Sequence, residues 1–217
     1  MVRLGNPSAT NNEDMMQTAR PFVQGAVGGV ALSKTTAGFA EPFKISVIMT
    51  GGTIAKTYDP RDAALRNVDP VVKRLIRSLR LEDTKVSFKE LMRKDSLDLD
   101  DDDRARIIKT ARSAMKRNHA LVIVHGTDTL STTGEALLAA VPAPTLPIIL
   151  TGAMVPFVVE GSDGLQNVTE ALFACRLLAP GIYAVFHGRA LAFPGVVKDR
   201  NILTFVKTSG TNSGKTP

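Results

Sequence analysis

Two short apolar runs, each followed at once by a turn that carries threonine, constrain the fold of this chain most. The first is ISVIM (residues 45–49), followed by TGGTI (50–54); the second is LVIV (121–124), followed by HGTDT (125–129). Runs of this length that are rich in β-branched residues and bounded by glycine are typical of strands buried on both faces. Ligands bind at the carboxyl ends of strands in open α/β sheets, so we expect the two turns to face each other in one site.

Segments with helical periodicity alternate with further strand-like segments along the chain. We predict helices over residues 69–79, about 100–117, 132–141 and 163–179, strands over 84–88, 147–150 and 181–186, and a loop over 94–98. Alternation of this kind predicts an α/β fold with an open, mostly parallel sheet and helices on both faces.

The ends of the chain differ in composition from its middle. We expect a disordered leader over residues 1–43, one α/β domain over 44–207 and a flexible tail over 208–217. We expect a cytoplasmic protein, with export as the alternative because residues 23–32 are weakly apolar and fit a poor signal peptide. No apolar run reaches about 18 residues, so we expect no membrane partner.

Charge and composition narrow the range of partners. The net charge is +6, but the chain has no Trp and only two Tyr, and most of its basic residues fall on the polar faces of predicted helices. This pattern disfavours nucleic-acid binding, whereas an anionic small molecule would suit the positive charge. The phosphate-binding patterns GxGxxG and Walker A are absent from the sequence, so we expect no nucleotide cofactor.

Two further features have structural rather than chemical interpretations. The carboxylates of Asp98, Asp100 and Asp102 have the spacing of a calcium loop, but Asp103 occupies the position where such a loop needs glycine. We interpret these residues as the start of a helix, whose dipole favours negative charge, and expect no metal. Cys175 falls on the apolar face of a predicted helix and is expected to pack in the core.

The two threonine turns together resemble the motifs of the bacterial-type L-asparaginases and related amidohydrolases. A third segment agrees with this resemblance: IILTGAM at residues 148–154, then GSDG at 161–164 and Asn167. The resemblance covers roughly residues 44–207, which correspond to the N-terminal domain of the family only. It implies an asparaginase-like α/β fold and hydrolysis of L-asparagine, or of glutamine, with no cofactor, and it leaves a homo-oligomer open.

The resemblance also implies which residues carry the reaction. Thr53 matches the nucleophile of the family, and Tyr58 is the candidate for the tyrosine that assists it from a nearby loop. Thr127 matches the second catalytic threonine. We expect the backbone amides of the glycine turns, at Gly52 and Gly126, to bind the substrate and to stabilise an oxyanion together with Thr127.

Three more residues match positions that hold the substrate in this family. Ser96 matches the serine that contacts the α-carboxylate, and Asp128 matches the aspartate that contacts the α-amino group. The carbonyl of Ala153 is expected to meet the substrate amide. Leu97 departs from the family, which often has glutamine at this position, so one polar contact is missing.

The resemblance fails at two catalytic groups. The family pairs its second threonine with a lysine, and counting from Asp163 to the place expected for that lysine reaches Leu178. No lysine occurs between Lys116 and Lys198, and Arg176 is a poor base because arginine stays protonated. The family also takes an acidic residue from a C-terminal domain that matches no part of this sequence, and Glu160 and Asp163 are the candidates to replace it.

These departures leave three hypotheses. The first is an asparaginase-type amidohydrolase made of a single domain. The second is a pseudoenzyme that binds an amino acid or amide without hydrolysing it. The third is an asparaginase-like subunit of an amidotransferase complex, which would require a partner.

Overall fold

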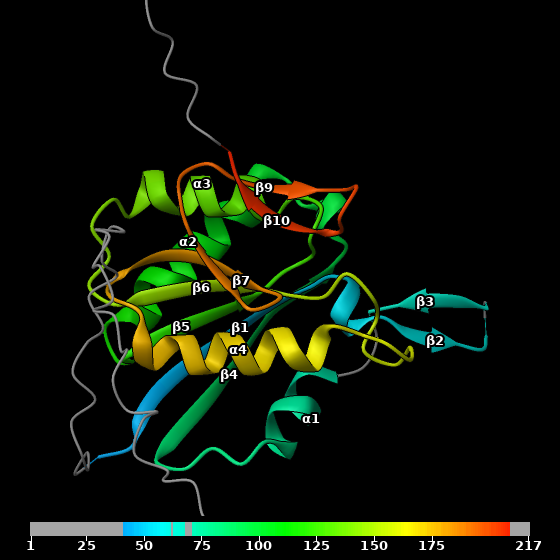
Figure 1. Cartoon of the computed structure of the whole chain (residues 1–217), viewed down its shortest axis with the longest axis horizontal. Helices are drawn as coiled ribbons and strands as arrows, with labels where there is room; N and C mark the ends of the chain where they lie inside the picture. The colour runs from blue at the N-terminus through cyan, green and yellow to red at the C-terminus, as the bar shows by residue number, and fades with distance from the viewer. Residues whose placement is uncertain (1–40, 62, 68–70, 209–217) are drawn as a thin grey trace, which may run out of the picture.

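The computed structural model describes residues 41–61, 63–67 and 71–208 (Figure 1). The expected leader, except for its last residues, and almost all of the expected tail therefore lie outside the described residues, as does the predicted start of the first helix at 69–70. No helix within the described ranges is long and apolar enough to cross a membrane.

A six-stranded sheet forms the centre of the fold, and it confirms the predicted α/β class with a mostly parallel sheet. Neighbouring strands in the order β4-β1-β5-β6-β7 run parallel, and only the edge strand β8 is antiparallel to β7. The bounds are β1 (Phe43–Gly51), β4 (Thr84–Lys94), β5 (Ala120–Val124), β6 (Pro147–Thr151), β7 (Gly181–Phe186) and β8 (Arg189–Ala192). Every residue of β5 and β6 is buried, as expected for central strands covered on both faces.

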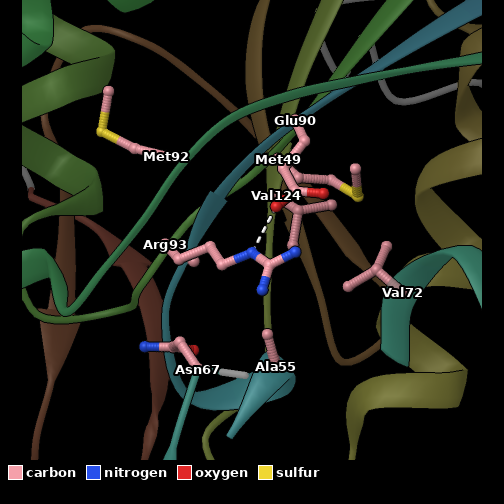
Figure 2. Close-up of a pocket in the computed structure, with 9 residues that line it drawn as sticks. Met49, Ala55, Asn67, Val72, Glu90, Met92, Arg93 and Val124 are labelled. Atoms are coloured by element: carbon pink, nitrogen blue, oxygen red, sulfur yellow. Dashed lines mark hydrogen bonds and ion pairs between the residues drawn. The ribbon is translucent and has the colours of Figure 1, made fainter. Parts of the chain in front are cut away.

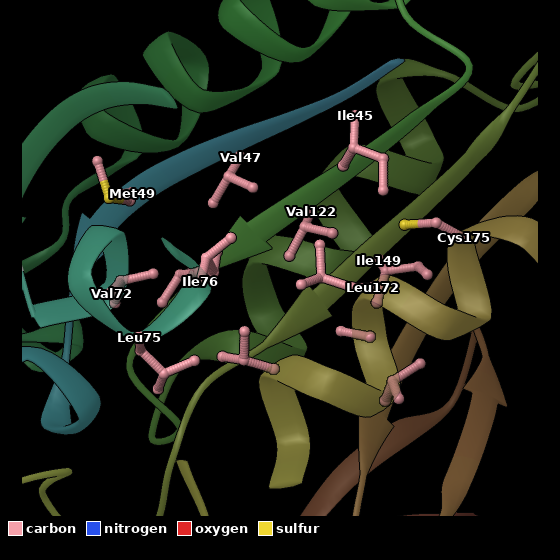
Figure 3. Close-up of a cluster of buried hydrophobic side chains, with 14 of the residues drawn as sticks. Ile45, Val47, Met49, Val72, Leu75, Ile76, Val122, Ile149, Leu172 and Cys175 are labelled. Atoms are coloured by element: carbon pink, nitrogen blue, oxygen red, sulfur yellow. The ribbon is translucent and has the colours of Figure 1, made fainter. Parts of the chain in front are cut away.

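Helices cover both faces of this sheet, as the sequence predicted. α1 (Val71–Ser78) and α4 (Gly164–Leu177) pack on one face, and α2 (Asp101–Met115) and α3 (Leu130–Ala140) pack on the other. Figure 3 shows the first of the two apolar clusters, in which side chains of β1, β5 and β6 meet those of α1 and α4. Cys175 is buried in this cluster, as predicted from its place on the helix.

Two small antiparallel sheets lie beside the main sheet. β2 (Thr57–Asp59) and β3 (Ala64–Arg66) form a hairpin that projects from the body of the molecule in Figure 1. β9 (Val196–Asp199) and β10 (Thr204–Lys207) pair next to α3. None of these four strands was predicted, because each is too short to show a hydrophobic period.

One boundary near the site differs from the predicted one. The strand predicted over 84–88 continues to Lys94, because β4 pairs with β1 beyond Phe88 and again, across an irregularity, between Gly51 and Lys94. The expected loop that follows contains a 3-10 turn, η2 (Ser96–Asp98). Asp100 and Asp103 then form a capping box at the start of α2, which confirms the structural interpretation of the acidic run.

Candidate active site

The two threonine turns meet through a pair of glycines, at the carboxyl ends of β1 and β5. A Cβ atom on Gly52, which has φ +88°, would lie 2.4 Å from the Cα atom of Gly126. A Cβ atom on Gly126 would in turn lie 2.6 Å from the side chain of Ser96. These distances are too short for any side chain, so glycine is required at both positions. The contact brings both turns and Ser96 to one place, as the sequence predicted for the two turns.

The two predicted catalytic threonines have different surroundings. Thr53 begins a 3-10 turn, η1 (Thr53–Ala55), directly after Gly52, and it is partly exposed. Its hydroxyl has no hydrogen-bond partner among the described residues and is free to approach a ligand. Thr127 is only 3% exposed, and its Oγ1 atom accepts a hydrogen bond from Nζ of Lys198 at 2.7 Å.

Lys198 corrects the sequence interpretation, which expected no lysine beside the second threonine. It comes from β9 and not from α4, where the count from Asp163 had ended at Leu178, the residue that closes α4. Contacts of β9 with α3 hold it next to the turn that precedes α3. In the sequence, Lys198 simply follows two valines on a short strand. This local pattern does not indicate which residues Lys198 contacts in the folded protein.

Asp128, the predicted ligand of the substrate amino group, is paired with two cations. Nζ of Lys198 lies 3.0 Å from its Oδ1 atom, and Nη2 of Arg200 lies 3.1 Å from the same oxygen. The side chain of Lys198 is 15% exposed and that of Arg200 is 72% exposed. Sequence reasoning missed Arg200, which follows β9 in a turn.

Ser96, the predicted contact of the substrate carboxylate, is buried against Gly126. Its hydroxyl is buried and has no hydrogen-bond partner within the described part of the chain, an arrangement that native proteins seldom tolerate. The hydroxyl of Thr129 donates to the carbonyl oxygen of Ser96 at 2.7 Å and fixes the backbone of η2 against the second threonine turn. Leu97, where the family often has glutamine, is largely exposed.

An ion pair joins the turn that carries Thr53 to the turn that carries Ser96. Nζ of Lys56, at the end of η1, lies 2.6 Å from Oδ2 of Asp95, which precedes η2 and caps it. The hydrogen bond from Lys56 is the main reason why the pKa of Asp95 lies below its ordinary value. Both side chains are roughly 30% exposed, so the pair holds the two turns in register and contributes about 1 kcal/mol or less to stability.

The third motif (residues 148–154, 161–164 and Asn167) is held together by hydrogen bonds around the turn at Ala153. The carboxylate of Asp163 accepts hydrogen bonds from the backbone N–H groups of Met154 and Val155 at 2.9 and 3.0 Å. The side-chain amide of Asn167 donates to the carbonyl oxygen of Gly152 at 3.0 Å. Together they fix the turn that contains Ala153, which is fully buried.

Asp163 is committed to this supporting role and is not a free replacement for the acidic residue that the family takes from its C-terminal domain. Burial opposes its charge, but the pKa of Asp163 is still lowered, because N–H groups of Met154 and Val155 and the ring of His187 bind the carboxylate. Glu160 is exposed in the loop before α4, and its role stays a prediction.

The hydroxyl of Tyr58 forms no hydrogen bond with Thr53 or Thr127. Its side chain is 61% exposed on β2, in the projecting hairpin, and makes no hydrogen bond within the described residues. The assisting role of Tyr58 therefore stays a prediction that needs movement of the hairpin. The other tyrosine of the chain, Tyr183 on β7, donates its hydroxyl proton to the carbonyl oxygen of Ala179.

A small cavity backs onto the turn that carries Thr53 (Figure 2). Apolar side chains from β1, β4, β5 and α1 line it, and an ion pair between Glu90 and Arg93 crosses it. Neither Thr53 nor Thr127 is among the described residues that line this cavity, although Gly51 and Ala55, on either side of Thr53, are.

His125 supports the second threonine turn from inside the protein. Its Nδ1 atom lies 2.7 Å from the carbonyl oxygen of Gly126, and its Nε2 atom lies 2.9 Å from the hydroxyl of Thr133. Because a carbonyl can only accept, Nδ1 carries the proton and Nε2 accepts from Thr133. Burial lowers the pKa of His125 from 6.5 to about 4, so the ring is neutral near pH 7.

This pKa shift predicts a loss of stability in acid. The unfolded chain takes up a proton on His125 below pH 6.5, whereas the folded chain does so only near pH 4. Stability is therefore lost as the pH falls from 6.5 to 4, by about 3 kcal/mol at most for this one group. Urea unfolding across this range, compared with a His125→Asn variant, measures the effect. A variant curve with the same slope as the wild type would contradict the assignment to His125.

Comparison with known families identifies the sequence pattern. Residues 44–208 match the profile of the family described as "Asparaginase, N-terminal". An L-asparaginase of Thermococcus kodakarensis is 36% identical over 146 residues, which are 66% of this chain and 44% of that protein. One subunit of the glutamyl-tRNA(Gln) amidotransferase of Thermoplasma acidophilum is 30% identical over 129 residues, 59% of this chain and 32% of its own length.

Solved structures give the same result for the fold. The thermostable L-asparaginase from Thermococcus kodakarensis superimposes with a TM-score of 0.68 at 28% identity, over 76% of this chain and 51% of that one. A probable cytoplasmic L-asparaginase from Campylobacter jejuni gives a TM-score of 0.63 at 26% identity, with the same coverage. The chain thus spans about half the length of the relatives it matches.

Proposed function

Because this chain belongs to the asparaginase family, through the N-terminal domain of that family, we propose that it hydrolyses L-asparagine to L-aspartate and ammonia through a threonine acyl-enzyme. One observation carries the proposal: the Lys198 ammonium contacts both Thr127 and Asp128, in the turn whose Gly126 packs against Gly52, the residue before Thr53. A hydroxyl beside a lysine and a carboxylate is an arrangement suited to proton transfer, and the sequence had suggested that it was lacking.

In the first half of the reaction, Oγ1 of Thr53 attacks the carbon of the side-chain amide. The new C–O bond turns the carbonyl oxygen into an oxyanion, which the amides of the glycine turns stabilise. The amide C–N bond then breaks, and the proton lost by Thr53 leaves with the nitrogen as ammonia. Tyr58 is the proposed carrier of this proton once the hairpin closes.

In the second half, water attacks the Thr53 ester. Thr127 holds the water, whose proton is relayed through the Thr127 hydroxyl and Nζ of Lys198. The ester C–O bond breaks, and the proton returns to Oγ1 of Thr53, which releases L-aspartate. Asp128 orients Lys198 in this step, and Ser96 holds the carboxylate of the substrate.

A second candidate function is the ammonia-producing component of an amidotransferase. The match to the glutamyl-tRNA(Gln) amidotransferase of Thermoplasma acidophilum favours it, since that relative is one part of a larger assembly. In that case the same threonine chemistry would act on an amide only when the partner is present. Co-purification of a second protein or of RNA with the full chain would support this alternative.

Hydroxylamine trapping tests the proposed acyl-enzyme. The full chain is incubated with L-asparagine, and ammonia, L-aspartate and the β-hydroxamate are quantified with and without hydroxylamine. We expect ammonia and aspartate in equal amounts, and diversion of product to the hydroxamate, because a stronger nucleophile than water competes for the ester. Ammonia release without any hydroxamate would argue against a covalent intermediate. Binding of L-asparagine without ammonia release would identify a binding protein.

A further inference from the structure

Arg200 occupies the carboxylate that an amino-acid substrate would use for its ammonium group. Its Nη2 atom lies 3.1 Å from Oδ1 of Asp128, the same oxygen that Lys198 contacts at 3.0 Å. The Arg200 side chain is 72% exposed, so it reaches the carboxylate from the solvent side, whereas Lys198 reaches it from the protein side with 15% exposure. A solvent-exposed cation therefore already contacts Oδ1 of Asp128.

The charges at this point do not balance. One carboxylate, Asp128, is paired with two cations, Lys198 and Arg200, so these three side chains together carry a net charge of +1. The carboxylate of Asp199, between the two cations in the sequence, accepts a hydrogen bond from the backbone N–H of Asn201 instead. The neighbouring pair of Lys56 and Asp95, beside Ser96, is neutral. An ammonium group that binds Asp128 must share this one carboxylate with Lys198 and Arg200 and is repelled by both, whereas a carboxylate is attracted.

We infer that Arg200 sets the substrate class of this site: it favours ω-amides of dicarboxylic acids that lack a free α-amino group over L-asparagine. The inference rests on the proposed function and deepens it. Succinamate is the simplest such amide, because it keeps the amide and the carboxylate of asparagine and replaces the ammonium-bearing carbon with a methylene. Succinamate carries a single negative charge, which suits the two cations beside Asp128. The asparagine zwitterion carries no net charge.

Binding of the two product acids tests the inference without any turnover. Succinate and L-aspartate are titrated by calorimetry into the full chain, into Arg200→Gln and into Arg189→Gln. Arg189 is a control of equal charge, since it is an exposed arginine on β8, away from β9. We expect the wild type and Arg189→Gln to bind succinate about tenfold more tightly than aspartate, and Arg200→Gln to lose or reverse this preference.

Hydrolysis of succinamate and L-asparagine by the same three proteins separates this inference from the proposed function. Suppose that neither amide releases ammonia, but succinate still binds more tightly than L-aspartate to the wild type and not to Arg200→Gln. The proposed hydrolysis is then wrong, and the inferred ligand class is retained. If both amides are hydrolysed and Arg200→Gln leaves the ratio of their kcat/KM values unchanged, the inference is wrong and the proposed function stands. Failure of both product acids to bind would also overturn the inference.

Discussion

Replacing Thr53 with alanine is expected to lower the rate of ammonia release by about 10⁴-fold or more, because it removes the proposed nucleophile. The loss should appear in kcat, whereas binding of the product acid should change little, since Ser96 and Asp128 remain in place. The Thr53 hydroxyl has no partner in the described structure, so its removal leaves no polar group unsatisfied. We therefore expect the variant to fold with a free energy of unfolding within about 0.5 kcal/mol of the wild type.

Two variants sharpen this test. Thr57→Ala removes a threonine hydroxyl from β2, four residues after Thr53 and on the same segment, and is expected to keep most of the activity. Thr53→Ser keeps a hydroxyl and should retain a measurable rate. If Thr53→Ala released ammonia at more than a tenth of the wild-type rate while remaining folded, Thr53 could not be the nucleophile, and Thr127 would become the candidate.

The predictable parts of the fold are those that follow from hydrophobic patterns within one segment of the chain. The apolar runs of β1, β5 and β6 indicate a parallel sheet, because strands that are apolar along their length are covered on both faces. The order of the strands and the reversed direction of β8 were not predicted, because pairing between distant segments leaves no periodic signal in one sequence. β4 was predicted too short for a related reason: it alternates and its exposed residues resemble a loop, but pairing with β1 extends it.

Some residues of the candidate site were also predictable from local motifs, whereas others were not. Thr53, Thr127 and Ser96 were identified from short motifs, and Gly52 and Gly126 explain how the motifs come together. Lys198 and Arg200 were missed because they act from a strand and a turn whose positions depend on packing against α3. The third motif was also identified: the hydrogen bonds of Asp163 fix the turn that contains Ala153, and the contact of the Ala153 carbonyl with the substrate amide stays a prediction.

Replacing Lys198 with methionine is expected to lower kcat by about 10²–10⁴-fold, the range found when a general base is removed. Methionine keeps the length and apolar stem of lysine but accepts no proton. The fold should tolerate the change because Arg200 remains paired with Asp128, so no buried carboxylate is left without a cation. Steady-state kinetics with L-asparagine and with succinamate measure the loss, and circular dichroism and urea unfolding verify that the variant is folded.

Lys198→Arg decides what Lys198 contributes. Arginine keeps the positive charge beside Asp128 and Thr127 but stays protonated at every accessible pH, so it donates hydrogen bonds and accepts no proton. If proton transfer through Thr127 limits the reaction, the arginine variant is as slow as the methionine variant, although it binds succinate as well as the wild type does. If the charge alone matters, arginine restores the rate to within about tenfold, since electrostatic stabilisation of the oxyanion survives the change. The second result would assign Lys198 to substrate binding and would leave the Thr127 hydroxyl without a base among the described residues that contact it.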